Sequence, residues 1–91
     1  MEIELRFFAN FRDIVGQKTI TREYGDTATI GDIMRALSAE YPEMELFADD
    51  GTVRDYLTIM KDGRDITYID GLDTELESNS TVSLFPPVAG G

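Results

Sequence analysis

The feature that most restricts the fold of this chain is an alternating segment at its start. In residues 2–8, Ile3, Leu5 and Phe7 lie on one side and mostly charged side chains on the other. Because successive side chains of a strand point to opposite faces, this pattern predicts a half-buried strand. Residues 81–85 repeat the pattern near the other end of the chain. We therefore expect the first and last strands to lie centrally in one sheet.

A single helix is expected to cover the buried face of that sheet. Thr29 and Asp32 have the spacing of a capping box, and Pro42 ends the run that follows. Between them, apolar residues recur at helical spacing and form one stripe, which consists of Ile30, Ile33, Met34, Leu37 and Tyr41.

The remaining segments complete an α+β pattern with five strands in a mixed sheet. Residues 18–24 read as a strand joined to the first by a short turn or helix that ends at Gly16. Residues 56–61 and 64–69 read as a hairpin around Asp62-Gly63. The acidic stretch 43–55 reads as a loop pinned by Leu46, Phe47 and Val53, and Leu72 and Leu76 indicate a short helical turn.

Composition excludes several classes of function. With no cysteine and no histidine, the chain lacks thiol nucleophiles, Cys/His zinc sites and the commonest general base. The formal net charge of −10 disfavours nucleic acid and anionic membranes as partners and favours basic protein surfaces. Adaptation to high salt is an alternative explanation of that charge. The acidic, alternating start is not a signal peptide, so we expect a cytoplasmic protein.

The chain ends in Phe85-Pro86-Pro87-Val88-Ala89-Gly90-Gly91. Two prolines fix their own φ angles, and the two glycines after them carry no Cβ and fit a narrow channel. The last reactive group is then a bare main-chain carboxylate on Gly91.

The opening FFAxxRxxxG (Phe7 to Gly16) and the ending FPPVAGG together resemble the small subunit of molybdopterin synthase (MoaD) and the small archaeal modifier proteins, which are ubiquitin-like sulfur carriers. The resemblance spans the whole chain. It implies a β-grasp (ubiquitin-like) domain over residues 1–85 and a flexible Gly-Gly tail over residues 86–91. Residues 78–80 depart from the acidic turn of many relatives, which puts the local turn geometry in doubt.

The resemblance also implies the chemistry. An E1-like adenylating enzyme would use ATP and Mg to activate the Gly91 carboxylate, since this chain has no phosphate-binding loop and is expected to bind no cofactor and no metal. The activated carboxylate would become a thiocarboxylate, a sulfur donor to the large subunit of molybdopterin synthase or for tRNA thiolation. Alternatively, it would form an isopeptide bond with lysines of target proteins. Both fates use the same tail residues, which are Pro86, Pro87, Val88, Ala89, Gly90 and Gly91.

A partner surface is predicted from the alternation itself. If the core residues face the helix, Phe8, Met60 and Phe85 point to the uncovered side of the sheet, where they would dock the partner enzyme. The alternative is that the loop 43–55 folds over them. Two further classes of function stay open: a purely non-covalent interaction module, and a free-standing enzyme, which the missing nucleophile, base and metal ligands disfavour.

Overall fold

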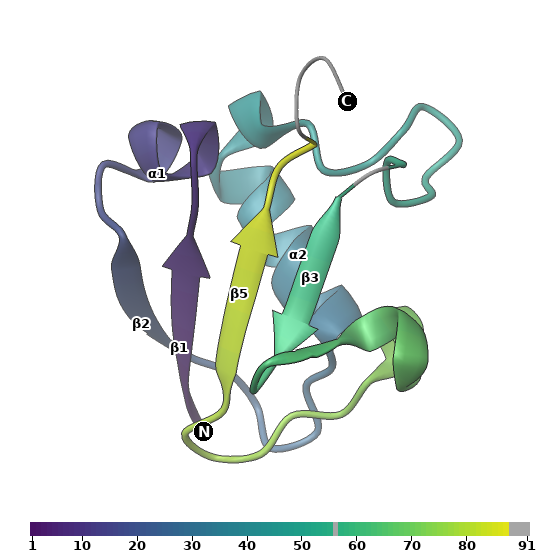
Figure 1. The fold of residues 1–91 in the computed structure, drawn as a ribbon. Helices are drawn as coiled ribbons and strands as arrows, with labels where there is room; N and C mark the ends of the chain where they lie inside the picture. Colours follow the sequence, from purple (N-terminus) through teal and green to yellow (C-terminus); the bar gives the residue numbers. More distant parts are fainter. Residues whose placement is uncertain (56, 88–91) are drawn as a thin grey trace.

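The sheet is built around its first and last strands, as the alternating segments predict. In the computed structural model, which describes residues 1–55 and 57–87, β1 (Glu2–Phe7) runs parallel to β5 (Thr81–Phe85). The other strands are β2 (Thr19–Glu23), β3 (Thr58–Lys61) and β4 (Arg64–Asp65). Their order across the five-stranded sheet is β2-β1-β5-β3-β4, with every pair except β1–β5 antiparallel (Figure 1).

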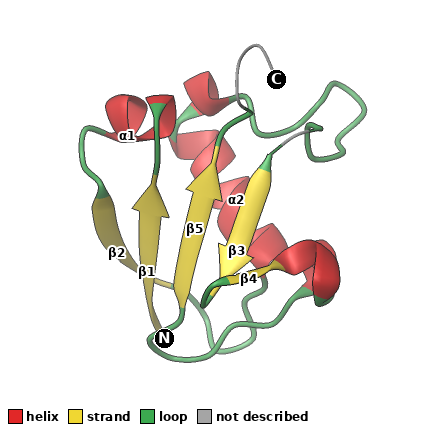
Figure 2. Cartoon of the chain, viewed as in Figure 1, coloured by secondary structure: helices red, strands yellow, loops and turns green. Residues whose placement is uncertain are grey.

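The main helix, α2 (Ile30–Glu40), crosses one face of the sheet and leaves the other face open (Figure 2). The inward side chains of β1, Ile3, Leu5 and Phe7, are fully buried. Removal of so much apolar surface from water is the main stabilising term of a small domain. The predicted helix stripe is also buried, except that Tyr41 is half-buried at the C-terminal end of the helix. The core also includes Phe11, Ala28, Met44, Leu46, Ile59, Ile66, Leu76, Val82 and Leu84.

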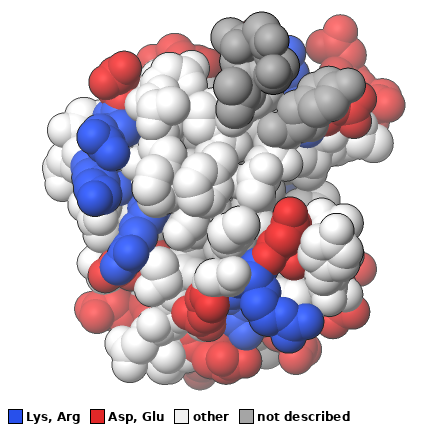
Figure 3. Space-filling model, in the orientation of Figure 1, with Lys and Arg blue, Asp and Glu red and all other residues white. Residues whose placement is uncertain are grey.

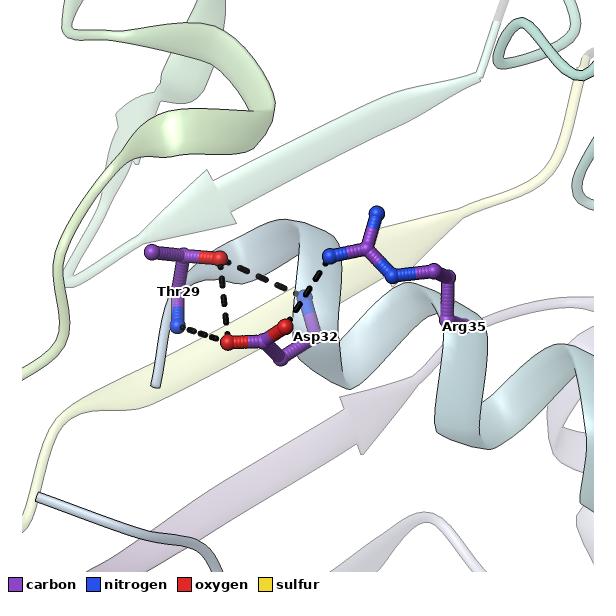
Figure 4. A network of polar contacts seen from close by, with 3 residues as sticks. All are labelled: Thr29, Asp32 and Arg35. Carbon is purple, nitrogen blue, oxygen red and sulfur yellow. Dashed lines mark hydrogen bonds and ion pairs between the residues drawn. The ribbon is translucent and has the colours of Figure 1, made fainter. Parts of the chain in front are cut away.

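The start of α2 has the predicted capping box (Figure 4). The Asp32 carboxylate accepts a hydrogen bond from the Thr29 backbone N–H at 3.0 Å, and the Asp32 N–H donates to Thr29 Oγ1 at 3.4 Å. Arg35 also donates to the Asp32 carboxylate at 2.9 Å. The Thr29 amide, and after it Arg35, hold the pKa of Asp32 below its usual value.

The other end of α2 is tied to the edge strand β2. The guanidinium of Arg22 makes two hydrogen bonds of 2.7 Å to the carboxylate of Glu40. This bidentate contact lowers the pKa of Glu40 and raises the pKa of Arg22. The helix is therefore fixed to the sheet by an ion pair as well as by its apolar stripe.

The predicted hairpin is only partly correct. Asp62 and Gly63 do form its turn, with φ angles of 49° and 85°. However, the second strand ends at Asp65. A 3-10 helix, Ile66–Tyr68, forms where the strand was predicted to continue over residues 66–69. The reason is local, because the Asp65 carboxylate accepts a hydrogen bond from the Thr67 N–H at 2.9 Å and so turns the chain.

The shorter predicted elements are confirmed in outline. A short helix α1 (Asn10–Val15) ends at Gly16, whose φ of 86° is in the left-handed region that glycine favours. A 3-10 helix, Gly71–Asp73, stands where a helical turn was predicted, and another, Pro42–Met44, follows α2. No helix in the described part of the chain is long and apolar enough to cross a membrane.

Candidate functional site

The C-terminal segment leaves the sheet at the end of β5, between β1 and β3. Phe85 is the last residue of β5, Pro86 after it is half-buried, and Pro87 is exposed. The predicted tail residues Val88, Ala89, Gly90 and Gly91 lie outside the described residues. The division into a domain over residues 1–85 and a flexible tail over residues 86–91 stays a prediction.

An aromatic pair lies beside this exit. In the parallel register of β1 and β5, Phe7 lies opposite Leu84. The next residues, Phe8 and Phe85, therefore meet on the other face of the sheet. Their rings stack with centroids 4.2 Å apart and an interplanar angle of 12°. Such a pair adds about 0.5–1.5 kcal/mol beyond its buried area, and it fixes the position from which the tail begins.

A tight turn follows Phe8 and holds it in place. The Phe11 N–H donates to the Phe8 carbonyl at 3.1 Å, so residues 8–11 form a four-residue turn. Its second residue, Ala9, has φ 53° and ψ −132°, a conformation that strongly favours glycine. Ala9 also occupies the N-cap position of α1 without a side-chain cap. The backbone is therefore strained immediately beside the aromatic pair.

Met60 lies on the same open face, one strand further across. It pairs with Ser83 on β5, and Thr58 pairs with Phe85, so Met60 and Phe85 are diagonal neighbours. All three predicted partner-binding residues are half-buried, and none belongs to the core or to the side chains packed against it. The structure thus brings Phe8 and Phe85 into direct contact and places Met60 beside them.

The alternative prediction, that the loop 43–55 folds over Phe8, Met60 and Phe85, is wrong. The loop 43–55 turns its anchors to the helix side of the sheet, where Met44 and Leu46 are buried in the core. Phe47 and Val53 form a bridge within the loop and pack against the same core. Phe8, Met60 and Phe85, half-buried on the open face, take no part in these contacts.

The open face is not as acidic as the rest of the molecule. Residues 5–22 contain one acid, Asp13, and four bases, of which Arg22 lies on the helix side of the sheet, opposite Ile3 and bonded to Glu40. Figure 3 shows Lys and Arg side chains down the left of this face and an uncharged middle. Arg6, on β1, pairs with Glu4 at 2.7 Å and lies opposite Ser83. The uncharged centre of this face thus has basic side chains along one side.

A groove of about 250 Å³ opens next to the exit of the tail. Pro86 and Pro87 form one side of it, and Phe11 and Leu57 contribute further apolar surface. Its remaining lining is Asn10, Glu43, Met44, Glu45 and Arg54. A partner that holds the tail would contact this groove at the same time, because the prolines belong to both.

Ionisable groups with shifted pKa values lie in local structural contacts. The pKa of Asp50 is lowered by hydrogen bonds from Thr52, as the pKa values of Asp32 and Glu40 are lowered by theirs. Burial raises the pKa of Tyr24. Among the described residues there is no group of three or more His, Cys, Asp or Glu arranged to hold a metal ion.

A mixed sheet with parallel first and last strands and one helix across a single face is the ubiquitin-like β-grasp. The profile of the ThiS family matches residues 5–91, so the chain belongs to that family. It is 48% identical over 92 residues to small archaeal modifier protein 3 of Haloferax volcanii, with all of both chains covered.

Solved structures agree with this assignment. The crystal structure of SAMP1 from Haloferax volcanii has a TM-score of 0.85 and 28% identity, again with both chains fully covered. A chain in the crystal structure of the Amycolatopsis orientalis BexX/CysO complex has a TM-score of 0.76 at 19% identity, with 98% of this chain and 99% of that chain covered, which shows a shared fold. The predicted family and the predicted β-grasp fold are confirmed. The relatives are modifiers, as predicted, rather than enzymes.

The sequence reasoning missed two features of the site. The strained Ala9 arises in the local turn of residues 8–11, and the groove beside Pro86 arises from contacts between segments far apart in the chain. The first had a signal, since the turn of residues 8–11 contains no glycine. The groove had none.

Proposed function

We propose that this chain is a ubiquitin-like carrier and modifier whose Gly91 carboxylate is activated as an acyl-adenylate by an E1-like enzyme. The activating enzyme supplies ATP and Mg, and this chain supplies the carboxylate and the surface that presents it. The attack of the Gly91 carboxylate on the α-phosphate of ATP releases pyrophosphate. The chemistry depends mainly on positioning, which a substrate docked through a rigid domain provides.

The activated carbonyl then has two fates. Transfer of sulfur displaces AMP and gives a thiocarboxylate, which donates sulfur to molybdopterin synthesis, through the synthase large subunit, or to tRNA thiolation. Attack by a lysine amine displaces AMP and gives an isopeptide bond to a target protein. The 48% identity to a small archaeal modifier protein supports the second fate, and membership of the ThiS family supports this class of chemistry as a whole.

The observation that carries the proposal is the position of the tail relative to the aromatic pair. Phe8 and Phe85 stack at 4.2 Å on the open face, and Pro86 follows Phe85 directly. A partner that covers the pair is therefore adjacent to the start of the tail. The uncharged centre suits an apolar contact, because aromatic residues and Met are enriched at interfaces. The fold relative in a two-protein complex supports such docking.

The first test is mass spectrometry of the chain and its covalent adducts from native cells under nonreducing, amine-free conditions. Replacement of one terminal oxygen by sulfur establishes the carrier, and a Gly-Gly branch on lysines of other proteins establishes the modifier. Deletion of Gly91 is expected to abolish both products. If the deleted chain still forms either, the proposed role of this carboxylate is wrong.

The docking surface has a separate test. Phe8→Asp and Met60→Glu place charges in the apolar centre of the open face and are expected to weaken binding to the activating enzyme. Glu23→Lys, an exposed change on the edge strand, is the control for altered charge. If both open-face variants fold and bind like the parent chain, the predicted surface is not used.

A non-covalent interaction module is the alternative, and the same chain distinguishes it. The alternative predicts that one residue added after Gly91 changes nothing, because the carboxylate then has no role. Our proposal predicts that this extension removes adenylation and leaves partner binding largely intact.

A further inference from the structure

We propose that the chain has a second docking surface, centred on Tyr68 and distinct from the aromatic pair, which takes a basic segment of a partner protein that carries an apolar anchor side chain. The surface consists of Tyr68, the groove beside it and the acids Asp65, Asp70 and Asp73 in or next to the two 3-10 helices. We call it the Tyr68 surface. Its occupancy requires neither Gly91 nor the activating enzyme. One of its groove residues, Leu57, also lines the groove beside Pro86.

Tyr68 is the first component. Its exposed fraction is 79%, and it is the only exposed large hydrophobic residue among those the structure describes. The residue ends the 3-10 helix Ile66–Tyr68, which Asp65 caps, and the Tyr68 carbonyl accepts a hydrogen bond from Arg64 at 3.4 Å. Its backbone is therefore held while its ring lies in solvent. Tyr is among the residues that contribute most to binding when a partner covers them.

The second component is an apolar groove of about 180 Å³ next to this helix. Ile66 and Leu72 line it from the 3-10 helices, and Ile59 lines it from β3. The other lining residues are Val53, Leu57, Asp65, Thr67 and Gly71. For scale, an enclosed cavity of about 150 Å³ lined by Leu, Ile and Phe accommodates benzene. The groove is thus of a size to accept one leucine or phenylalanine side chain.

Charge identifies the kind of partner. Residues 62–77 contain a single base, Arg64, and six acids, of which five are exposed and one, Asp65, lines the groove. Lys61 neutralises one of the six, Glu77, at 3.0 Å. Residues 5–22 show the reverse, with four bases and one acid. The acids in or next to the two 3-10 helices, which attract a basic segment, are Asp65, Asp70 and Asp73.

The position of this surface makes it usable while the tail is engaged. In Figure 1 the segment after β4, coloured green, lies at the lower right, whereas β5 ends at the top of the sheet. A partner bound at Tyr68 therefore leaves the Phe8–Phe85 pair uncovered. Two proteins of different charge can be held by one chain at the same time.

The probe for this surface is the synthetic peptide KRLFRK, titrated into isotope-labelled protein and followed by backbone amide shifts. Two further peptides separate the contributions: KRSGRK lacks the apolar anchor and EELFEE reverses the charge. We expect KRLFRK to shift amides in residues 65–73 and the two others to bind at least about tenfold more weakly. Deletion of Gly91 is expected to leave this binding unchanged.

Variants locate the site. Tyr68→Ala should weaken binding at least about tenfold, because the exposed ring supports binding and not folding. Asp70→Asn combined with Asp73→Asn should weaken it several-fold, and the matched pair Asp13→Asn with Asp49→Asn should not. Unchanged amide spectra away from the mutations show that each variant is folded. Shifts spread over the whole acidic surface, equal binding of KRSGRK, or no effect of Tyr68→Ala would each overturn the proposal.

Discussion

Replacement of Ala9 by glycine is predicted to stabilise the protein. Ala9 has φ 53° and ψ −132°, where a Cβ atom is poorly tolerated. A non-glycine residue held in such a region costs about 1–3 kcal/mol. The side chain is exposed, so its removal leaves no cavity. Glycine is also a better N-cap than alanine, and Ala9 is the N-cap of α1.

The opposing term is the greater freedom of glycine in the unfolded chain. An Ala-to-Gly change loses about 0.4–1 kcal/mol in this way. The net gain in the free energy of unfolding should therefore be about 1 kcal/mol, which raises Tm by roughly 4–8 °C for a domain of this size.

Ala36→Gly is the matched control, because it makes the same chemical change at an exposed position inside α2. Glycine in a helix interior is expected to cost about 1 kcal/mol, so the two variants should differ by about 2 kcal/mol in chemical denaturation. The unfolded-state term cancels in this difference. If Ala9→Gly destabilises the protein as much as Ala36→Gly does, the strain at Ala9 is not real.

Four further predictions concern stability. Leu5→Ala, at a fully buried position in β1, should cost about 2–5 kcal/mol in urea denaturation; a smaller loss would mean that the core readily collapses around the missing side chain. Thr29→Ala should cost about 1 kcal/mol by loss of the cap. The folded-state pKa of Asp32 is lowered, so its ionised carboxylate stabilises the folded protein. This stabilisation is present above the unfolded-state pKa of about 4 and is lost as pH falls through the folded-state pKa. An Asp32→Ala variant should therefore differ from the parent at pH 7 and converge with it in acid, as melting curves across that range will show. Added KCl should raise Tm, because salt screens the repulsion among the acidic side chains that give the chain its net charge of −10. An unchanged Tm would show that this repulsion has little effect on stability.

Much of the fold could be predicted because its main elements depend on local patterns. The alternation around Leu5 places β1 and its buried face, and the Thr29–Asp32 spacing places the start of α2. The central position of β1 and β5 also followed from their apolar inner faces. The parallel pairing of these two strands came instead from the family resemblance, since no local pattern encodes which distant strands meet.

The error in the hairpin arose where a hydrogen bond from the backbone to a side chain took the place of strand pairing. The apolar residues Ile66 and Ile69 favoured a continued strand, but Asp65 caps the next turn and Ile66 enters the core from a 3-10 helix. The shared face of Phe8 and Phe85 was predicted correctly, because alternation alone sends both side chains to one side of the sheet, and their role in binding a partner stays a prediction. That their rings stack could not be predicted without the register of β1 against β5.

The parallel pairing of β1 and β5 also explains why the two proposed docking surfaces lie at different ends of the strands. Parallel strands finish at the same edge of a sheet, so the turn at Ala9, the ring of Phe8 and the exit of the tail at Pro86 are neighbours. β3 runs antiparallel to β5, so the chain leaves β3 at the opposite end of the strands. The 3-10 helices, one of which contains Tyr68, follow there. A partner that holds the tail and a partner that holds Tyr68 therefore need not compete. Loss of binding at one surface should leave binding at the other unchanged.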